Sequence, residues 1–451
     1  MPNCVSVIGL GKLGAPMAAA LAARGVDVIG VDADAAKVEA VQQGRPPVFE
    51  PGLAEALLAG HARLTATQNV EDAVRDSDMT FIVVATPAET DGSFSLRYVL
   101  PLCEAIGRVL ASKNEFHLVA LTSTVMPGST GGAVRDALER ASRKRAGIDF
   151  GLCYSPEFIA LGSVIRDFLN PDLLLIGETD ERSGGMLESL YHQVCENKPA
   201  VARMNLVNAE IAKLAVNTFV TTKISFANML ARLCERVAGA SVDVVTGAIG
   251  LDSRIGGKYL KGAISYGGPC FPRDNLALIA LADRVGASAG LPRATHEFNR
   301  AQIQGLADLV QRYLEAGKVA GILGLTYKPN TDVTEEAAGL LLARELARRK
   351  VPTLAFDPEG HVRAESSPGS EIQLAASAED CIGQSDVIVL TTPWPEFLKI
   401  PAGRWARVHS PRVVIDCWRA LSHLETAEGI VYIGLGNGAV REESMAEGAR
   451  Q

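Results

Sequence analysis

The sequence predicts an α/β protein with two doubly wound, Rossmann-like parallel-sheet domains, joined by a long central helix and an all-α middle domain. Three observations support this prediction. The chain opens with an apolar run, a glycine-rich turn and a helix of small residues, and a similar order of apolar runs returns in its last third. Between them, residues 205–239 keep apolar side chains at helical spacing without proline. We expect domains at 1–200, 201–315 and 316–451.

The first βαβ unit carries a dinucleotide-binding pattern. A strand is expected at 4–8, a helix at 15–23 and a second strand at 26–32. In the turn GLGKLG, Gly9, Gly11 and Gly14 have the spacing that lets backbone N–H groups and a helix N-terminus approach a pyrophosphate. Asp32 ends the second strand, where a carboxylate can bind a ribose diol and repel a 2′-phosphate. NAD is therefore favoured over NADP; the alternative is a strand-to-helix turn without a ligand.

Further apolar runs predict the rest of the two sheets and the middle domain. Strands are expected within 76–87 and 116–129 of the first sheet, and within 319–328, 351–359, 384–393 and 413–418 of the second, which the last of these completes. Helices near 240–250 and 273–315 complete the middle domain. The first turn of the second sheet, GLTYKPNTD, has a lysine and lacks the glycine fingerprint, so we expect it to hold something other than a dinucleotide.

Composition narrows the class of protein. At about 150 residues per domain, 451 residues suggest about three domains. The balance of 44 Lys plus Arg against 52 Asp plus Glu argues against a nucleic-acid or membrane partner. Eight cysteines without a CxxC or a Cys/His cluster predict neither disulfides nor a metal site. No signal peptide and no apolar run of about 18 residues is found, so a soluble cytoplasmic protein is expected.

Two groups of residues could carry chemistry. Lys213 and Asn217 lie four apart on the long helix, so they share one face, which is either solvated or forms an oxyanion clamp in an apolar surround. Cys270 lies in a GGPCFP stretch where Pro272 suits the first turn of a following helix, whose dipole would stabilise a thiolate. Asp274 falls on the same helical face and could accept a proton. A purely structural role for Cys270 remains the alternative.

The order of motifs resembles the nucleotide-sugar 6-dehydrogenase family, typified by UDP-glucose 6-dehydrogenase. The motifs are GLGKLG, VATP at 84–87, STVMPGS at 123–129, SPEF at 155–158, DFLNPD at 167–172, AEIAKLAVNTFVTTKISFAN at 209–228, GGPCFPRD at 267–274 and GLTYKPNTD at 324–332. The resemblance covers nearly the whole chain. It implies a four-electron, NAD-dependent oxidation of a sugar's primary alcohol to the uronic acid, through a cysteine-bound hemithioacetal and thioester, as in polysaccharide biosynthesis.

The resemblance also implies roles for individual residues. Cys270 is the expected nucleophile, Lys213 and Asn217 stabilise an oxyanion, Asp274 assists proton transfer, and Glu157 and Thr124 hold or activate a water. The expected cofactor-binding residues are Gly9, Gly11, Leu13, Gly14, Asp32, Lys37, Thr86 and Thr124. The expected substrate-binding residues are Glu157, Phe158, Lys213, Asn217, Arg254, Lys258, Tyr259, Gly267 and Lys328. Arg254 matches an arginine that reaches a neighbouring subunit's substrate, which implies a homodimer or higher homo-oligomer.

Several positions depart from the family pattern. Arg273 stands where a lysine is usual, Pro269 where a serine is usual, and Leu161 where a glutamate is frequent. Glu335 occupies the position of an expected arginine, and DCWRAL replaces the usual Asp-x-Arg stretch, with Arg419 near enough in sequence to compensate. The chemistry is expected to be intact, while the substrate-recognition rim is altered.

The substrate stays open at this point. UDP-glucose is the first expectation, because the branch that oxidises N-acetylhexosamine nucleotides usually has an arginine where this chain has Phe158. UDP-HexNAc and GDP-mannose are the nearest alternatives. A single-hydride β-hydroxyacid-type dehydrogenase is another, since it shares the glycine turn and a lysine four residues before an asparagine, but it lacks the second sheet domain. A non-catalytic nucleotide-sugar sensor is the third.

Overall fold

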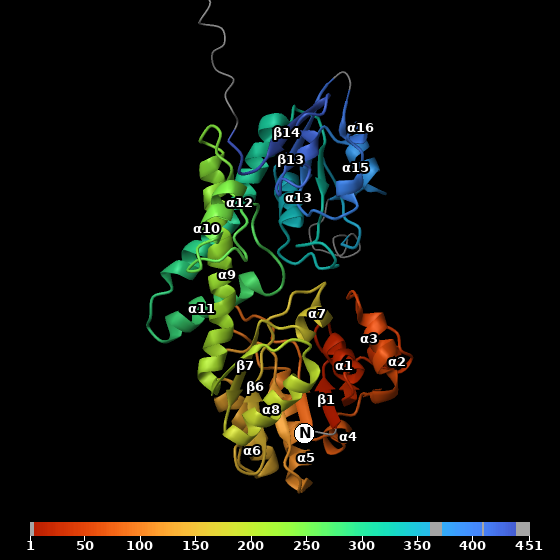
Figure 1. Ribbon diagram of the computed structural model, residues 1–451, viewed down its shortest axis with the longest axis vertical. Coiled ribbons are helices and arrows are strands. Elements are labelled where there is room, and N and C mark those ends of the chain that lie inside the picture. Colours follow the sequence, from red (N-terminus) through yellow and green to blue (C-terminus); the bar gives the residue numbers. More distant parts are fainter. Residues whose placement is uncertain (1–3, 361–371, 408–409, 439–451) are drawn as a thin grey trace, which may run out of the picture. The chain divides into compact units, whose positions relative to one another are not determined.

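The structure is a computed structural model that describes residues 4–360, 372–407 and 410–438 (Figure 1). Within these residues the chain divides into two compact units. The first holds the residues up to Val216 together with Ala277–Ser288, and the second holds Asn217–Leu276 and the residues from Ala289 onward. Each unit is built around one sheet, which confirms the predicted pair of parallel-sheet α/β domains.

The sheet of the first unit has the strand order β3-β2-β1-β4-β5-β6-β7-β8. Its strands are β1 (Cys4–Ile8), β2 (Asp27–Val31), β3 (Leu64–Thr67), β4 (Met79–Ile82), β5 (Leu118–Leu121), β6 (Gly151–Tyr154), β7 (Leu173–Glu178) and β8 (Ala200–Asn205). Neighbouring strands pair in parallel, except that β7 runs antiparallel to β6. Crossing from β3 to β6, the order 3-2-1-4-5-6 is that of a dinucleotide-binding sheet.

Helices cover both faces of this sheet. They are α1 (Gly14–Ala23), α2 (Ala35–Gln42), α3 (Leu53–Gly60), α4 (Val70–Arg75), α5 (Val99–Ser112), α6 (Arg135–Ser142), α7 (Val164–Leu169) and α8 (Glu181–Val194), with short helical turns at His61–Arg63 and Thr130–Val134. Strand residues alternate between the faces, so Phe81 joins the core formed with α1 and α8, while Ile82 joins the core formed with α5 and α6. The two apolar cores hold the turn after β1 on a rigid support.

The second unit contains an all-parallel sheet in the order β11-β10-β9-β12-β13-β14. Its strands are β9 (Ala320–Leu323), β10 (Thr353–Phe356), β11 (Gln373–Leu374), β12 (Val387–Leu390), β13 (Arg412–Asp416) and β14 (Ile430–Gly434). The helices around it are α13 (Ala338–Arg348), α15 (Ala378–Gln384) and α16 (Ala402–Trp405), with short turns at Phe397–Lys399 and Ser422–Leu424. The prediction that the 413–418 strand completes this sheet is wrong, because β14 pairs with β13 beyond it.

The remaining helices include the predicted long one. It is α9 (Leu206–Cys234), which leaves the first unit and continues into the second. It is followed by α10 (Val242–Gly250), α11 (Phe271–Arg284) and α12 (Gly290–Tyr313). The expected helix over 273–315 is therefore two helices, because Gly286 adopts a left-handed φ of 70° after α11 and ends it. Among the described residues, no helix is long and apolar enough to cross a membrane.

Candidate active site

The turn after β1 has the geometry of a dinucleotide-binding loop. Gly9 has a φ of +106°, and a Cβ on it would lie 2.2 Å from the Val83 carbonyl oxygen. A Cβ on Gly14, the first residue of α1, would lie 1.8 Å from the Gly9 carbonyl oxygen. By contrast, a Cβ on Gly11 would meet no atom within 4 Å. Gly9 and Gly14 therefore make the turn possible, while Gly11 leaves space beside the backbone for a phosphate.

Asp32 lies against this turn, at the end of β2. Its Oδ2 accepts a hydrogen bond from the Leu10 N–H at 2.8 Å, and its Oδ1 accepts one from Asp34 N–H at 2.9 Å. The Lys37 ammonium lies 3.4 Å from Asp32 Oδ2. The structure thus brings Asp32 and Lys37 to the glycine turn, and Leu13 directly precedes α1.

Two further cofactor candidates meet at the ends of neighbouring strands. Thr86 follows β4, Thr124 follows β5, and the Thr86 hydroxyl donates to the Thr124 carbonyl oxygen at 2.7 Å. Because the carboxyl ends of β1, β4 and β5 share one edge of the parallel sheet, these threonines lie at the edge that carries the glycine turn. The open space at Gly11, the carboxylate and this edge fit NAD.

A second cluster of candidates follows β6 in the same unit. The Glu157 carboxyl accepts a hydrogen bond from the Tyr191 hydroxyl at 3.0 Å, and burial raises the pKa of Glu157 to about 7. The Lys213 ammonium, from α9, donates to the Glu157 carbonyl oxygen and lies 4.5 Å from the centroid of the Phe158 ring. Glu157, Phe158 and Lys213 are therefore brought together, whereas sequence reasoning missed Tyr191, which lies in no recognised motif.

In the second unit, Cys270 directly precedes α11. Its carbonyl oxygen accepts the Asp274 N–H at 2.8 Å, so the cysteine caps the helix as the sequence predicts. All eight cysteines lie in the described part of the chain, and Cys270 alone is exposed. Asp274 is 1% exposed, and its Oδ2 accepts a hydrogen bond from the Asn217 amide at 2.6 Å. Asn217 and Asp274 are thus brought together.

The stretch that leads to Cys270 is fixed by two asparagines that mimic a paired strand. Asn228 accepts from Ala263 N–H and donates to the Ile264 carbonyl, at 2.7 and 2.9 Å. Asn299 makes the same pair of bonds to the backbone of Tyr266, both at 2.9 Å. Sequence reasoning missed both residues, although Asn228 ends one of the motifs quoted above.

Beyond this stretch, the chain packs on the long loop after β9. A Cβ on Gly267 would lie 2.2 Å from the Glu336 carbonyl oxygen, and Gly268 N–H donates to the Glu335 carbonyl at 2.9 Å. Only glycine fits this close approach of two backbones. The same loop carries Lys328, whose ammonium lies 5.9 Å from the Tyr327 ring centroid.

The loop with Arg254, Lys258 and Tyr259 reaches the Cys270 cluster through Tyr259, whose ring makes an edge-on contact with Phe271 at a centroid distance of 6.3 Å. Arg254 is largely exposed and pairs with Asp252 on its own loop at 2.6 Å. Lys258 and Tyr259 are exposed as well, and Tyr259 has a left-handed φ of 61°. The expectation that Arg419 substitutes for the missing arginine is not supported, because its guanidinium is bound to Asp243 at 2.7 and 2.8 Å and to backbone carbonyls.

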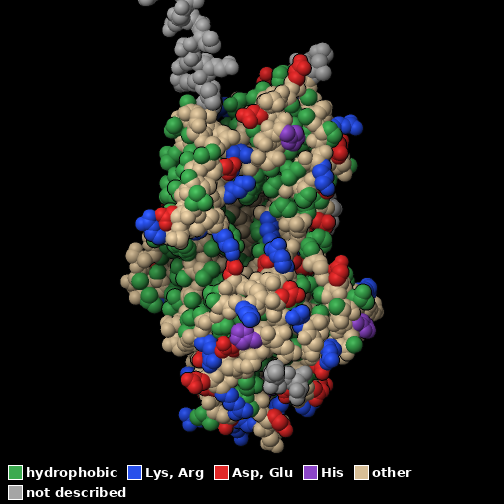
Figure 2. Space-filling view, viewed as in Figure 1, with side chains coloured by type: hydrophobic (Ala, Val, Ile, Leu, Met, Phe, Trp, Pro, Cys, Tyr) green, Lys and Arg blue, Asp and Glu red, His purple; other side chains and the backbone are tan. Residues whose placement is uncertain are grey.

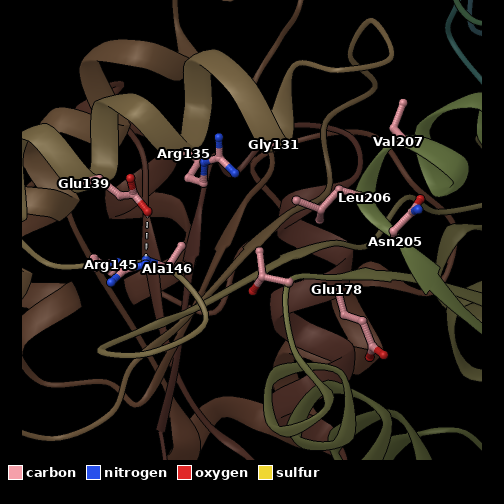
Figure 3. A pocket seen from close by; sticks show the side chains of 10 residues that line it. Gly131, Arg135, Glu139, Arg145, Ala146, Glu178, Asn205, Leu206 and Val207 are labelled. Carbon is pink, nitrogen blue, oxygen red and sulfur yellow. Dashed lines mark hydrogen bonds between the residues drawn. The ribbon is translucent and has the colours of Figure 1, made fainter.

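The first unit also contains a cavity of about 600 Å³ that is separate from these groups (Figure 3). It is lined by Gly131, Arg135, Glu139, Arg145, Ala146, Glu178, Thr179, Asn205, Leu206 and Val207. Since β7 is antiparallel to β6, the chain after Glu178 runs on toward the amino end of β6, and Glu178 itself pairs with Cys153. None of the predicted site residues lines this cavity.

The fold and the glycine turn define a dinucleotide-binding α/β protein. Models of the UDP-glucose/GDP-mannose dehydrogenase family match the chain over its NAD binding domain at residues 3–195, its central domain at 207–301 and its UDP binding domain at 321–423. The chain belongs to this family of NAD-dependent nucleotide-sugar dehydrogenases, which confirms the resemblance found in the sequence.

Relatives and solved structures agree with this placement. A UDP-glucose 6-dehydrogenase of Haloferax volcanii is 35% identical over 427 residues, covering 93% of this chain and 98% of the relative. A GDP-mannose 6-dehydrogenase of Azotobacter vinelandii is 32% identical, covering 89% and 94%. The structure of a UDP-glucose dehydrogenase from Pyrobaculum islandicum superposes with a TM-score of 0.88 at 33% identity, covering 97% of this chain and 98% of that one.

Proposed function

We propose that this protein oxidises the primary alcohol of a nucleotide sugar to the carboxylic acid in two hydride transfers, with UDP-glucose as the substrate and UDP-glucuronate as the product. NAD, when bound at the glycine turn, supplies the hydride acceptor. The observation that carries the proposal is that Cys270 is exposed and directly precedes α11, whose first turn holds Asp274, the hydrogen-bond partner of Asn217 on α9. A thiol at that position traps an aldehyde, and an alcohol cannot reach the acid by hydride transfer without a trapped or hydrated aldehyde.

The steps follow from the residues. The helix dipole favours the Cys270 thiolate, which attacks the aldehyde carbon and forms a C–S bond. The oxyanion of this hemithioacetal is stabilised by the Lys213 ammonium and the Asn217 amide. Loss of a second hydride gives the thioester. Water held by Glu157 and Thr124 then attacks its carbonyl carbon, and the C–S bond breaks. The carboxylate product is released and the Cys270 thiolate is regenerated on the enzyme, with Asp274 assisting the proton transfers.

Substrate and cofactor binding are proposed from the family's pattern. The cofactor is held by Gly9, Gly11, Leu13, Gly14, Asp32, Lys37, Thr86 and Thr124, and the nucleotide sugar by Phe158, Arg254, Lys258, Tyr259, Gly267 and Lys328 among others. The similarity to the Haloferax enzyme, whose name specifies UDP-glucose, favours that substrate. The similarity to a GDP-mannose enzyme keeps GDP-mannose as the second candidate.

The first experiment counts NADH formed per sugar consumed, with UDP-glucose, UDP-GlcNAc, UDP-ManNAc and GDP-mannose. Two NADH per UDP-glucose are expected. One NADH would support a single-hydride dehydrogenase, and none with any of the sugars would contradict the proposed activity.

The second experiment removes the trap. Cys270→Ser is expected to block completion of the second oxidation, whereas Cys4→Ser, a change at another cysteine that is not fully buried, leaves the stoichiometry at two. A Cys270→Ser variant that still makes full uronate would exclude the thiol as nucleophile.

We also propose that the protein is a cytoplasmic homodimer with domains at 1–200, 201–315 and 316–451. In the second unit, α9 exposes apolar side chains seven residues apart, at Phe219, Phe226 and Leu233, with Met229 between them. Hydrophobic side chains gather along this part of α9 and over α10 in Figure 2. This spacing is that of a helix seam which pairs with another helix. Sedimentation of the native protein is expected to give a dimer, and Phe226→Glu a monomer; a native monomer would contradict this part of the proposal.

A further inference from the structure

The Glu157 carboxyl is the end of a short chain of buried hydroxyl groups in the first unit. The Ser155 hydroxyl lies 2.6 Å from the Tyr191 hydroxyl, which donates to Glu157 Oε1 at 3.0 Å. Since the tyrosine proton points to the carboxyl, the serine is the donor of the first bond. Ser155 and Tyr191 are each 2% exposed, so both bonds form out of solvent. A hydrogen bond in such surroundings is stronger than in water.

The Tyr191 ring is fixed independently of these bonds. It lies on α8 between the rings of Phe81, from β4, and Phe168, from α7, with edge-on contacts at centroid distances of 6.5 and 6.2 Å. A ring wedged between two buried aromatics has no other rotamer that keeps its packing. The hydroxyl is therefore held at one place, and the carboxyl orients toward it.

Charged and titratable groups act on Glu157 from each element packed around it. Burial favours the neutral acid, whereas the Tyr191 hydroxyl on α8 and the Lys213 ammonium on α9 favour the carboxylate. The Cys195 thiol, which follows α8, donates to the Phe168 carbonyl oxygen, and burial together with the charge of Glu157 raises the pKa of the thiol to about 11. The cysteine therefore stays neutral and leaves the balance to Tyr191 and Lys213.

We propose that Tyr191 is a positioning residue for hydrolysis of the enzyme thioester: its hydroxyl, oriented by Ser155, holds the Glu157 carboxylate in the direction and charge state in which it accepts a proton from the attacking water. The inference rests on the proposed function. In this step the water oxygen bonds to the thioester carbonyl carbon, its proton passes to Glu157, and the C–S bond breaks to return the Cys270 thiolate. No electrons are exchanged, so no further co-reactant is needed.

The first test is kinetic and uses Tyr191→Phe, with Tyr98→Phe on the surface as the matched control. Loss of one hydrogen bond to a charged carboxyl is expected to move the acid limb of the kcat profile up by about one pH unit. Below that limb, turnover falls about tenfold, while KM for NAD and for the sugar is unchanged. The covalent adduct on Cys270 accumulates and is detected by mass spectrometry. A purely structural tyrosine would not move the acid limb selectively.

The second test does not depend on activity. The ¹³C signal of the Glu157 carboxyl is assigned as the difference between wild type and Glu157→Gln, and is titrated in wild type and in Tyr191→Phe. An upward shift of about one pH unit supports the inference. An unchanged titration or an unchanged kcat profile in folded Tyr191→Phe overturns it. If this variant does not fold, Ser155→Ala is used and is expected to shift the signal the same way by less.

These outcomes separate the two proposals. A wild type that makes no NADH from any of the four sugars contradicts the proposed function, while the carboxyl titration still tests the contact. If the wild type makes two NADH per sugar and the Glu157 titration is unshifted in Tyr191→Phe, the proposed function stands and the role of Tyr191 is excluded.

Discussion

The two sheets start with the same turn and use it differently. Gly9 and Gly324 follow β1 and β9, and both have a φ of +106°. A Cβ on Gly14 or on Gly339 would lie 1.8 Å from the carbonyl oxygen of Gly9 or of Gly324, respectively. The glycines that close the turn are thus repeated in the second sheet, although only the first pair lies in a recognisable fingerprint.

The difference between the sheets is the chain between the paired glycines. Residues 10–13 separate them in the first sheet and residues 325–338 in the second. In the second sheet this longer loop turns back on the strand-end aspartate, and Asp357 is fully buried. Its Oδ2 accepts from Leu325 N–H, Thr326 N–H and the Thr326 hydroxyl at 2.7 to 2.9 Å.

The corresponding carboxylate of the first sheet remains accessible. Asp32 keeps 12% of its side-chain surface, whereas Asp357 also accepts from Glu359 N–H and Gly360 N–H through its other oxygen. Asp32 is therefore partly accessible to a ligand, whereas Asp357 is not. The comparison teaches that the same closing glycines do not define the same ligand: in the second sheet the longer loop occupies the strand-end carboxylate, which agrees with the match of the first sheet to an NAD binding domain and of the second to a UDP binding domain.

The largest expected effect comes from a substitution that places a side chain inside the first glycine turn. Gly14→Ala is expected to abolish soluble, folded protein or NAD binding altogether, because the new methyl group meets backbone that cannot move away. Gly11→Ala, whose new Cβ would meet no atom within 4 Å, is expected to fold with an unchanged melting temperature and to bind NAD about tenfold more weakly, since the methyl group blocks the pyrophosphate. Calorimetric titration with NAD measures both. Equal behaviour of the two variants would contradict the distinction.

The next effect separates the two aspartates. Asp357→Asn is expected to cost about 3 kcal/mol of unfolding free energy, because the amide cannot accept all of the buried hydrogen bonds that the carboxylate accepts. Asp32→Asn is expected to weaken NAD binding about tenfold and to change stability by less than about 1 kcal/mol. Urea denaturation and NAD titration of both variants test this. A loss of NAD affinity in folded Asp357→Asn would show that the second sheet binds the cofactor.

A smaller effect comes from a buried histidine that precedes β5 in the first sheet. In the first unit, His117 is fully buried and bonded to Thr80 at 2.8 Å, and burial lowers the pKa of its ring to about 3. In the unfolded chain His117 takes up a proton near pH 6.5, whereas in the folded chain it stays neutral down to about pH 3. The free energy of unfolding therefore falls as the pH is lowered from about 6.5 toward 3. The slope is expected to be about 1.4 kcal/mol per pH unit from this group.

The control for this prediction is His117→Gln, which removes the titration. The unfolding free energy of this variant at neutral pH is expected to be lower than that of the wild type. Between about pH 4 and 6 its unfolding free energy is expected to change less steeply with pH, by about 1.4 kcal/mol per pH unit, because one titrating group is gone. Denaturation curves at three pH values measure the slope. A slope that is the same in both proteins would mean that other groups account for the acid sensitivity.

Much of the fold follows from local sequence, because the signals that predict helices, strands and turns lie within a few residues of one another. Apolar runs and turn glycines therefore predict the glycine turn with Asp32 and the long helix α9, each of which lies within one or two elements. The break between α11 and α12 could also have been found, since Gly286 stands within the predicted helix. Strand β14 could have been found as well, since its sequence IVYIG is a β-branched and aromatic run.

The site was predictable only as far as its residues fall in motifs. Cys270, Lys213 and Asn217 are predicted from helical spacing and from the resemblance, whereas Tyr191 stands more than thirty residues from Glu157 and follows no repeat. The burial of Asp357 depends on where a long loop folds, and no local pattern specifies this. Long-range contacts of polar side chains are therefore what the sequence leaves open.

The smallest expected effect is optical and tests the second sheet directly. Trp418 follows β13 at the carboxyl edge, its indole N–H donates to the Thr391 carbonyl at 2.8 Å, and it is partly exposed, while Trp394 and Trp405 are buried. If UDP binds at this edge, its base quenches the emission of Trp418, and Trp418→Ala weakens UDP binding about fivefold through loss of about 1 kcal/mol of stacking. Fluorescence titration of wild type and Trp418→Phe measures this, with NAD as the control ligand. Quenching by UDP that persists in Trp418→Phe would place the nucleotide away from the edge and leave the second turn without a ligand.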